Sequence, residues 1–193
     1  MATPPAAPPI EAALRGDRQA FQECLLGLAG PLFGYIASMV SHRADAEDLL
    51  QETLLKAVRG FDAFRPRGPA EAAFRGWLYR IAVNACRDHF RAAPAHASLD
   101  SEFDPDSIAA GALAGLSESP GEAVDRALRA GAVRRALATL NPDLREVVTL
   151  RLYAGLSFAE IAELQGCPLN TALGRMRYGL LQLRKQLEPV LKI

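Results

Sequence analysis

Apolar residues recur every three or four positions along most of the chain, and this spacing constrains the fold more than any other feature. It begins near Ile10, is lost between residues 94 and 123, and resumes to about Val190. Such a period lines one face of an α-helix with apolar side chains, whereas a half-buried strand needs strict alternation. Since only 7% of the residues are aromatic, a strand-rich fold is further disfavoured. We therefore predict an all-α chain of two small helical domains.

The first helical domain is predicted over residues 10–93, after a disordered, proline-rich leader at residues 1–9. After a break at Gly16, a helical apolar period runs from Phe21 to Met39, and further helices are expected at residues 45–60 and 70–92. Pro31 is expected to kink or divide the stretch that ends at Met39, and Asp45 is a plausible N-cap for the helix that follows it. The inward faces are expected to include Val58 and Trp77.

Charge is distributed unevenly along the chain, although its formal net charge is zero. Residues 1–93 carry +1, residues 94–123 carry −6, and residues 124–193 carry +5. Residues 94–123 also lack a sustained apolar period and are rich in Ser, Asp, Gly, Pro and Ala, as is typical of a linker. We therefore predict an acidic flexible linker, followed by a basic domain whose charge is hidden in the total.

The C-terminal domain, predicted over residues 124–193, contains a helix-turn-helix pattern. Asn141-Pro142 starts one helix with proline in its first turn. Ser157-Phe-Ala-Glu160 has the form of a capping box, and Gly166 permits the positive φ of a tight turn before a last helix over residues 169–190. The inward faces of these helices are expected to include Leu152, Leu173 and Leu180. Two helices joined by a glycine-containing turn, the second one basic, form a helix-turn-helix.

The second helix of such a motif enters the DNA major groove with its first turns near the base edges. The candidate DNA-binding residues on this helix are Asn170, Thr171, Gly174, Arg175, Arg177 and Tyr178. Arg177, with Arg184 and Lys185, is better placed for phosphate than for bases. The alternative is an ordinary helical bundle with solvated arginines.

The first domain offers two further polar surfaces. Asp48, Gln51 and Glu52 form an acidic and amide patch that suits a basic protein surface, although a solvated helix face would look the same. The other surface is basic and could hold single-stranded or duplex DNA. Its residues are Arg65, Arg67, Asn84, Arg87 and Arg91.

Several classes of function are excluded. The three cysteines include no CxxC pair, and the three histidines share no metal-ligand spacing with them, so we expect neither a disulfide framework nor a metal site. No glycine-rich phosphate loop or nucleophile elbow is present, so we expect no enzyme, no catalytic residue and no cofactor. No secretory signal and no apolar run near 18 residues is seen, which argues against export and membrane insertion. Cys167 is expected to be a small buried residue rather than a redox sensor.

Two motifs carry a family resemblance. The segments from Asp45 to Phe61 and from Phe74 to Arg91 resemble conserved region 2 of bacterial sigma factors of the extracytoplasmic-function (ECF) type. The segment 137–187, with Ser157-Phe-Ala-Glu-Ile-Ala and Gly166-Cys-Pro-Leu-Asn-Thr, resembles region 4 of the same family. The resemblance covers most of residues 17–92 and 124–188. It departs at Ala172-Leu-Gly-Arg175, where many members have Val-Lys-Ser-Arg.

The resemblance implies a cytoplasmic protein that directs core RNA polymerase to promoters and performs no catalysis. By this likeness, Asp48, Gln51 and Glu52 contact the β′ clamp, the basic surface of the first domain reads the −10 region and captures an unstacked base, and the helix from Leu169 reads the −35 element. The β flap and a cognate anti-sigma factor are further expected partners, and the linker follows a path towards the active-site cleft and RNA exit channel. The rival functions are a stand-alone DNA-binding regulator, which would leave the Asp48 patch without a role, and a helical adaptor that does not bind DNA.

Overall fold

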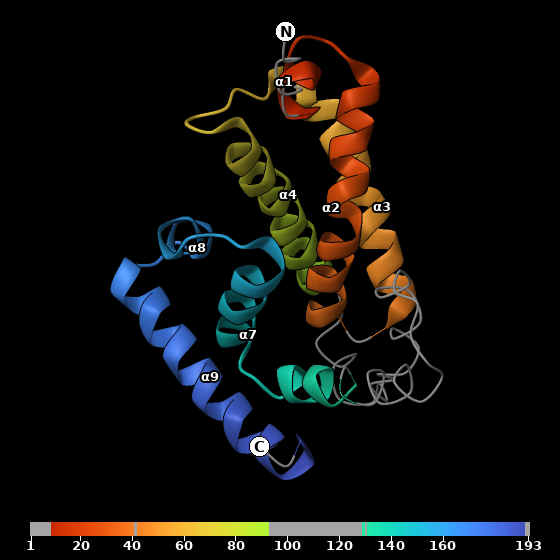
Figure 1. Cartoon of the computed structure of the whole chain (residues 1–193). Helices are drawn as coiled ribbons and strands as arrows, with labels where there is room; N and C mark the ends of the chain where they lie inside the picture. The colour runs from red at the N-terminus through yellow and green to blue at the C-terminus, as the bar shows by residue number, and fades with distance from the viewer. Residues whose placement is uncertain (1–8, 41, 93–128, 130, 192–193) are drawn as a thin grey trace, which may run out of the picture.

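The computed structural model describes residues 9–40, 42–92, 129 and 131–191. Every regular element within these ranges is a helix, so the all-α prediction is confirmed (Figure 1). The predicted linker 94–123 and the leader up to residue 8 lie outside the described residues. Two helical parts flank the segment 93–128, and we call them the N-terminal unit (residues 9–92) and the C-terminal unit (residues 131–191).

Four α-helices build the N-terminal unit. They are α1 (Pro9–Leu14), α2 (Arg18–Met39), α3 (Arg43–Gly60) and α4 (Ala70–Ala92). The Asp17 carboxylate caps α2 by accepting hydrogen bonds from the backbone N–H groups of Gln19 and Ala20, at 2.9 and 3.1 Å. Pro31 lies inside α2 and does not divide it. Helices α2, α3 and α4 pack against one another through fully buried side chains such as Ile36 and Leu78.

The start of α3 differs from the prediction. His42 is the N-cap, and its carbonyl accepts the first helical bond from the Ala46 N–H at 3.2 Å. An Arg43–Glu47 ion pair of 2.7 Å spans the first turn of α3, which starts two residues earlier than predicted. The Asp45 prediction was therefore wrong: this residue lies within the first turn, where its carboxylate favours the helix dipole.

An aromatic cluster fixes the connection between α3 and α4. A 3-10 turn, η1 (Phe61–Ala63), follows α3 directly. The Phe61 ring lies 4.1 Å from Phe21, centroid to centroid, and the Phe64 ring lies 5.9 Å from Phe74 and 5.0 Å from Trp77. Because Phe64 is only 6% exposed, the basic loop that follows it is held at the start of α4.

The C-terminal unit begins with a helix over residues 131–138 and continues through α7 (Pro142–Thr149), η2 (Leu150–Ala154), α8 (Phe158–Gln165) and α9 (Leu169–Leu191). Pro142 begins α7, as predicted, and the Asn141 side chain caps the helix by accepting from the Asp143 N–H at 3.0 Å. Gly155 and Gly166 both adopt left-handed conformations, with φ of 61° and 62°, and end the helices that precede them.

The element η2 is a π-helix, a wider turn than the expected continuation of α7. The wider turn rotates its side chains relative to an α-helix. Leu152, predicted to face inward, is 63% exposed, whereas the ring of Tyr153 lies against α2 at Gly34. The prediction for Leu152 was wrong because a spacing of 3.6 residues does not apply to a π-turn.

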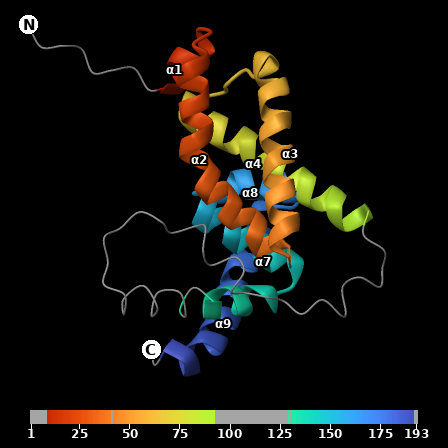
Figure 2. The same ribbon diagram turned by 90° about the vertical axis from the view of Figure 1, so that its right-hand side faces the viewer.

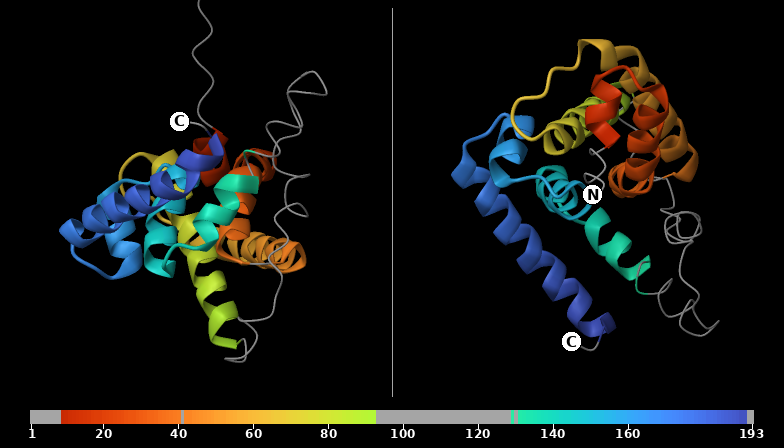
Figure 3. Two further views of the ribbon diagram at one scale, coloured as in Figure 1. Left: turned by 90° about the horizontal axis from the view of Figure 1, so that it is seen from below. Right: turned by 45° about the horizontal axis from the view of Figure 1, so that its top comes forward.

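The two units lie against each other (Figure 2) and share one hydrophobic core. Val147, Leu150 and Ile161 of the C-terminal unit are fully buried together with residues of α2 and α4. A second, smaller cluster around Leu140 and Leu183 joins α7 and α9 within the C-terminal unit. The predicted two-part organisation is thus present, but the parts are packed together. Helices α3 and α9 lie on opposite flanks of the assembled molecule (Figure 3).

Helix α2 has the length and composition of a possible membrane span. It has 22 residues and a mean hydropathy of 1.2 over its most apolar stretch, of which 33% is buried inside the protein. The buried residues, which include Leu32, Tyr35 and Ile36, pack against α3, α4 and η2. The buried side of α2 is therefore part of the core that the two units share.

Candidate nucleic-acid interface

The helix-turn-helix is formed by α8 and α9. The Ser157 hydroxyl accepts from the Glu160 N–H at 3.3 Å, and the Glu160 carboxylate accepts from the Ser157 N–H at 2.7 Å, so the predicted capping box is confirmed. After Gly166, the Cys167 N–H donates to the Ala162 carbonyl at 3.0 Å and completes the turn. The Cys167 side chain, predicted to be buried, is half-buried.

The solvent-facing side of α9 carries most of the predicted DNA-binding residues. Asn170, Thr171 and Arg177 are exposed, and Tyr178 is 64% exposed. Gly174, in the same stretch of helix, has no atom within 4 Å of the position of an added Cβ. These residues present amide, hydroxyl, guanidinium and phenol groups, which suit base edges and phosphates.

Arg175 is oriented differently from its neighbours. Its guanidinium donates to the Gln165 side-chain oxygen at 2.8 Å and forms an ion pair with Asp143 of α7. The side chain is half-buried. Arg175 therefore braces α9 against α7 and α8 in this structure. The sequence places it in the predicted recognition surface by helical spacing alone, which carries no information on its partners.

Helix α9 also exposes apolar side chains. Leu173, Leu180 and Leu181 are 41, 47 and 54% exposed, so the inward orientation predicted for Leu173 and Leu180 was wrong. Gly179 and Ala172 face the core instead. The leucines line an open groove of about 460 Å³ with Phe158, and it is flanked by Arg177 and Arg184. An apolar groove with basic edges suits a protein segment of opposite charge.

The acidic and amide patch on α3 is open to solvent. Asp48, Gln51 and Glu52 are all exposed, and Glu52 pairs with Lys56 at 2.6 Å. Next to them, Leu55 is 51% exposed and Val58 is 54% exposed, so the inward orientation predicted for Val58 was wrong. Sequence reasoning missed this apolar part of the surface, because helical spacing alone does not show which face lacks a partner helix.

The predicted basic surface of the N-terminal unit divides into residues with and without close partners. Arg65 donates to the carbonyls of Asp62 and Phe64, at 2.7 and 2.8 Å, and Arg91 pairs with Asp88 at 2.7 Å. Arg67 and Asn84 are exposed. Arg80, Asn84, Arg87 and Arg91 follow one another at helical spacing on one stripe of α4.

Arg87 is bound to the C-terminal unit. Its Nη2 donates to both carboxylate oxygens of Glu146, at 3.2 and 3.0 Å, and its Nη1 donates to the Leu164 carbonyl at 3.1 Å. Glu146 is buried, and it also accepts from the Gln165 amide at 2.9 Å. Sequence reasoning did not find these contacts, because Glu146 and Leu164 lie 59 and 77 positions after Arg87 in the chain.

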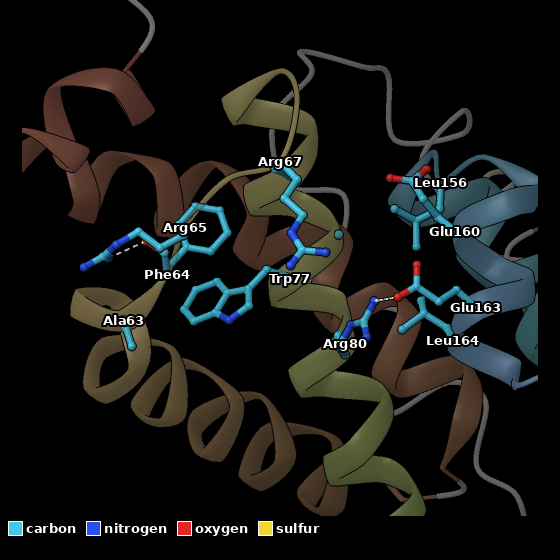
Figure 4. A pocket seen from close by; sticks show the side chains of 12 residues that line it. Ala63, Phe64, Arg65, Arg67, Trp77, Arg80, Leu156, Glu160, Glu163 and Leu164 are labelled. Atoms are coloured by element: carbon cyan, nitrogen blue, oxygen red, sulfur yellow. Dashed lines mark hydrogen bonds and ion pairs between the residues drawn. The ribbon is translucent and has the colours of Figure 1, made fainter.

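A pocket of about 470 Å³ lies between the basic loop, α4 and α8 (Figure 4). Trp77, predicted to be core, is half-buried and lines this pocket near Arg67 and Arg80. From α8, Glu163 accepts from Arg80 at 2.8 Å, and this hydrogen bond lowers the pKa of the Glu163 carboxyl group. The described residues contain no group of three or more side chains arranged to hold a metal ion.

Family models match both units. The model described as Sigma-70 region 2 matches residues 22–94, and the model described as Sigma-70, region 4 matches residues 130–177. The first covers most of the N-terminal unit, and the second covers the C-terminal unit into the first part of α9. Together they span more than half of the chain.

Relatives match the chain over almost its whole length. The RNA polymerase sigma-H factor of Pseudomonas aeruginosa is 33% identical over 190 residues, which cover 95% of this chain and 94% of that protein. The ECF RNA polymerase sigma-E factor of Escherichia coli K12 is 31% identical over 189 residues, with the same coverage of both chains.

Two solved structures share the fold. One is the sigma factor RpoE in complex with the anti-sigma factor NepR from Bartonella quintana, with a TM-score of 0.62, 24% identity, and coverage of 87% of this chain and 96% of that one. The other is CnrH in complex with the cytosolic domain of CnrY, with a TM-score of 0.63, 23% identity, and coverage of 94% and 96%. Since both family regions and relatives of similar length match, the resemblance noted in the sequence is confirmed, and the chain belongs to the ECF sigma factors of the sigma-70 family, which direct transcription initiation by RNA polymerase without being enzymes.

Proposed function

We propose a division of labour among three surfaces of this sigma factor. Asp48, Gln51 and Glu52 of α3 bind the β′ clamp of core RNA polymerase. The exposed face of α9 binds the −35 element through Asn170, Thr171, Gly174, Arg177 and Tyr178, with Arg175 bracing the helix. The basic loop and α4 bind the −10 region through Arg65, Arg67, Asn84, Arg87 and Arg91.

One observation carries this proposal: helices α3 and α9 lie on opposite flanks of the molecule, and each exposes polar side chains to solvent. A chain with this arrangement can hold polymerase on one side and duplex DNA on the other at the same time. A stand-alone regulator would have no use for the α3 patch, whose exposed carboxylates repel DNA. The separation therefore favours the sigma function over that alternative.

The pocket beside Trp77 supports base capture within the −10 region. An aromatic ring next to guanidinium groups suits a base taken out of its stack, together with its phosphate. Unstacking costs a few kcal/mol, and a pocket that holds the base offsets that cost. We propose that this pocket receives an unstacked base of the non-template strand once Glu160 and Glu163 have moved from it.

Charge reversal on α3 tests the division of labour. Asp48→Lys should abolish comigration with core RNA polymerase and leave binding of duplex DNA by α9 unchanged. Glu23→Lys is the matched control, because Glu23 is an exposed acid on α2, outside all three surfaces. In vitro transcription on genomic fragments, with mapped 5′ ends, should give new starts with the wild type and the control and none with Asp48→Lys. New starts from Asp48→Lys at the wild-type level would overturn the assignment of this patch.

The C-terminal unit has one further surface to assign. We propose that the β flap binds the groove of α9 lined by Leu173, Leu180 and Leu181. Exposed leucines favour contact with an apolar protein surface over contact with DNA. We also propose a cognate anti-sigma factor, as in the related structure of RpoE with NepR, and action in the cytoplasm, where the polymerase works. Leu180→Asp should weaken holoenzyme stability, and Gln182→Asp, on another side of α9, should not.

A further inference from the structure

The side-chain amide of Gln165 joins the three helices α7, α8 and α9. Gln165 ends α8, and its Nε2 donates to the Asp143 carbonyl at 3.0 Å and to the Glu146 carboxylate at 2.9 Å, both on α7. A carbonyl and a carboxylate only accept hydrogen bonds, so the amide nitrogen has to face α7 and the amide oxygen faces α9. There the oxygen accepts from Arg175 Nη1 at 2.8 Å. Helix α7 thus fixes which atom of Gln165 meets the recognition helix.

The Arg175 guanidinium is held on two sides. Its Nη1 donates to Gln165, and its Nη2 forms an ion pair with the Asp143 carboxylate. A planar guanidinium bound at both terminal nitrogens has little freedom to turn. Only 24% of the Arg175 side chain is exposed to solvent. Arg175 is therefore a paired cation in a fixed position.

This paired cation lies at the edge of the proposed −35 surface. Asp143 and Arg175 line an open groove of about 510 Å³ between α7 and α9, together with Thr171, Gly174 and Tyr178. The last three belong to the residues proposed to bind the −35 element. A guanidinium that was free to turn at this edge could reach the phosphates of any duplex bound to α9.

A phosphate contact at this edge would change DNA binding in a characteristic way. Contacts to phosphate strengthen binding to every sequence and steepen its dependence on salt, but they carry no sequence information. A protein that selects one element among many competing sites depends on the ratio of its specific to its non-specific affinity. Pairing Arg175 with Asp143 removes one non-specific contact and, at the same time, braces α9 against its neighbours.

We propose that Asp143 and Gln165 determine DNA specificity without touching DNA. They withhold the Arg175 guanidinium from phosphates and use it to set the orientation of α9. The sequence preference of the C-terminal unit then comes from the exposed side chains of α9, whose positions depend on this brace. Asp143 and Gln165 are thus positioning residues, and the inference rests on the proposed binding of the −35 element by α9.

Four variants of the full-length chain separate the charge from the brace. Asp143→Ala removes the ion-pair partner and leaves Arg175 with its hydrogen bond to Gln165. Asp143→Ala combined with Arg175→Leu removes both charges and keeps the net charge of the wild type. Gln165→Met keeps the length of the side chain and the Arg175–Asp143 pair but removes the amide. Glu188→Gln, at an exposed position late in α9, has the same net charge as Asp143→Ala and is the control.

The first readout is the salt dependence of binding to a labelled mixed-sequence duplex, measured by fluorescence anisotropy. Asp143→Ala should bind this duplex about fivefold more tightly at low salt, and the slope of log K against log salt should be steeper by about 0.9, the value for one added phosphate contact. The double variant should return to the wild-type slope. Gln165→Met and Glu188→Gln should also keep the wild-type slope, because Arg175 stays paired in both.

The second readout is the ratio of two affinities. The second duplex is copied from the region upstream of a start that the wild type produces with core polymerase. The ratio of affinity for this duplex to affinity for the mixed-sequence duplex should fall roughly fivefold in Asp143→Ala, in the double variant and in Gln165→Met, and it should not change in Glu188→Gln. Far-UV circular dichroism at the wild-type helix content is the check of folding.

Three results would overturn the proposal. A double variant with a slope shallower than the wild type by about 0.9 would show that Arg175 itself contacts phosphate. An unchanged slope in Asp143→Ala would show that the carboxylate withholds nothing from DNA. An unchanged affinity ratio in Gln165→Met would show that the amide does not position α9.

Transcription by the wild type with core polymerase is scored separately. An absence of new starts would speak against the proposed function, and the mixed-sequence measurement does not depend on mapped starts. New starts together with one of the three results above would overturn only the roles given to Asp143 and Gln165.

Discussion

At the scale of single residues, the packing of α9 against α7 depends on one glycine. A Cβ added at Gly179 would lie 2.8 Å from Val148 Cγ2, a distance that packed atoms do not tolerate. Val148 is fully buried and has little room to move. The approach of the two helices is therefore set by the absence of a side chain at position 179.

We predict that Gly179→Ala lowers the free energy of unfolding by about 1–3 kcal/mol, because it overpacks this contact. Gly174→Ala is the control on the same helix, where an added Cβ meets nothing within 4 Å. Since alanine favours a helix over glycine, this control should gain up to about 1 kcal/mol. Urea unfolding of both variants measures the difference, and equal stabilities would show that α7 yields to the extra methyl group.

Burial of Cys86 on α4 makes a pH dependence predictable. Burial raises the pKa of its thiol from 9.0 to about 12. Because the unfolded chain loses this proton at lower pH than the folded one, the free energy of unfolding falls as pH rises from 9 towards 12, by up to about 1.4 kcal/mol per pH unit. Below pH 9 both states keep the proton, and the contribution is constant.

Unfolding of the wild type and of Cys86→Ala between pH 8 and pH 10 tests this effect. The decline in stability should be steeper for the wild type. Alkylation at pH 8 gives an independent readout: the folded protein should be modified at Cys86 only after denaturant is added. Rapid labelling of Cys86 in the native protein would contradict the prediction.

Residues that cap helices were the most predictable from sequence. The capping box of Ser157 with Glu160, the helix start at Pro142 and the turn at Gly166 all occur as predicted, because each depends on backbone groups only a few positions away. The wrong prediction of Asp45 as an N-cap also rested on a local signal alone. An acidic residue near a helix start fits the N-cap and the first turn equally well.

At the scale of elements, α8 is the part of the helix-turn-helix most dependent on a local signal. It has only eight residues, too few for a stable isolated helix. Its capping box also sets the position of Glu160 beside the pocket. Loss of the cap should therefore disturb the turn into α9 as well as α8 itself.

We predict that Ser157→Ala lowers the free energy of unfolding by about 1 kcal/mol. It should also weaken binding of duplex DNA by α9, because the recognition helix is oriented by α8. Ser157→Thr, which retains the capping hydroxyl, should restore both properties. If Ser157→Ala keeps the wild-type stability and DNA affinity, packing alone positions α8.

Helix existence and ends were predictable where polar caps or proline punctuate the sequence. Residues 70–92 form α4 as predicted, and α9 begins at Leu169 as predicted. The π-turn of η2 was not predictable, because its side chains are selected by contact with α2 and not by local spacing. The same limit explains the wrong inward predictions for Val58, Leu173 and Leu180. Their exposure depends on which helix faces lack a neighbouring helix, and local spacing does not show this.

At the scale of the whole molecule, the shared core couples the stability of the two units. Val147 and Leu150 are buried among residues of α2 and α4, more than 60 positions away in the chain. The sequence predicts both helical parts but not their docking, since neither Glu146 nor Arg87 carries a local sign of its partner. Such pairs are determined only by the tertiary arrangement.

We predict that calorimetry of the wild-type chain shows one cooperative thermal transition, because unfolding of either unit exposes the core of the other. Gly34→Ala should separate this into two transitions, with the C-terminal unit melting first because it has the smaller core of its own. Gly30→Ala should keep a single transition. Two resolved transitions in the wild type would show that the units fold independently.

Trp77 gives the molecule an intrinsic optical signal. It is the chain's sole tryptophan, its ring lies 5.0 Å from Phe64, and it lines a pocket that Leu156 and Glu160 of the other unit also line. Indole fluorescence shifts to longer wavelength when water reaches the ring. The emission maximum of the unlabelled protein therefore reports whether Leu156 and Glu160 still line the pocket beside Trp77. A stopped-flow mixing experiment with polymerase or nucleic acid can follow a movement of the C-terminal unit away from this pocket without any added dye.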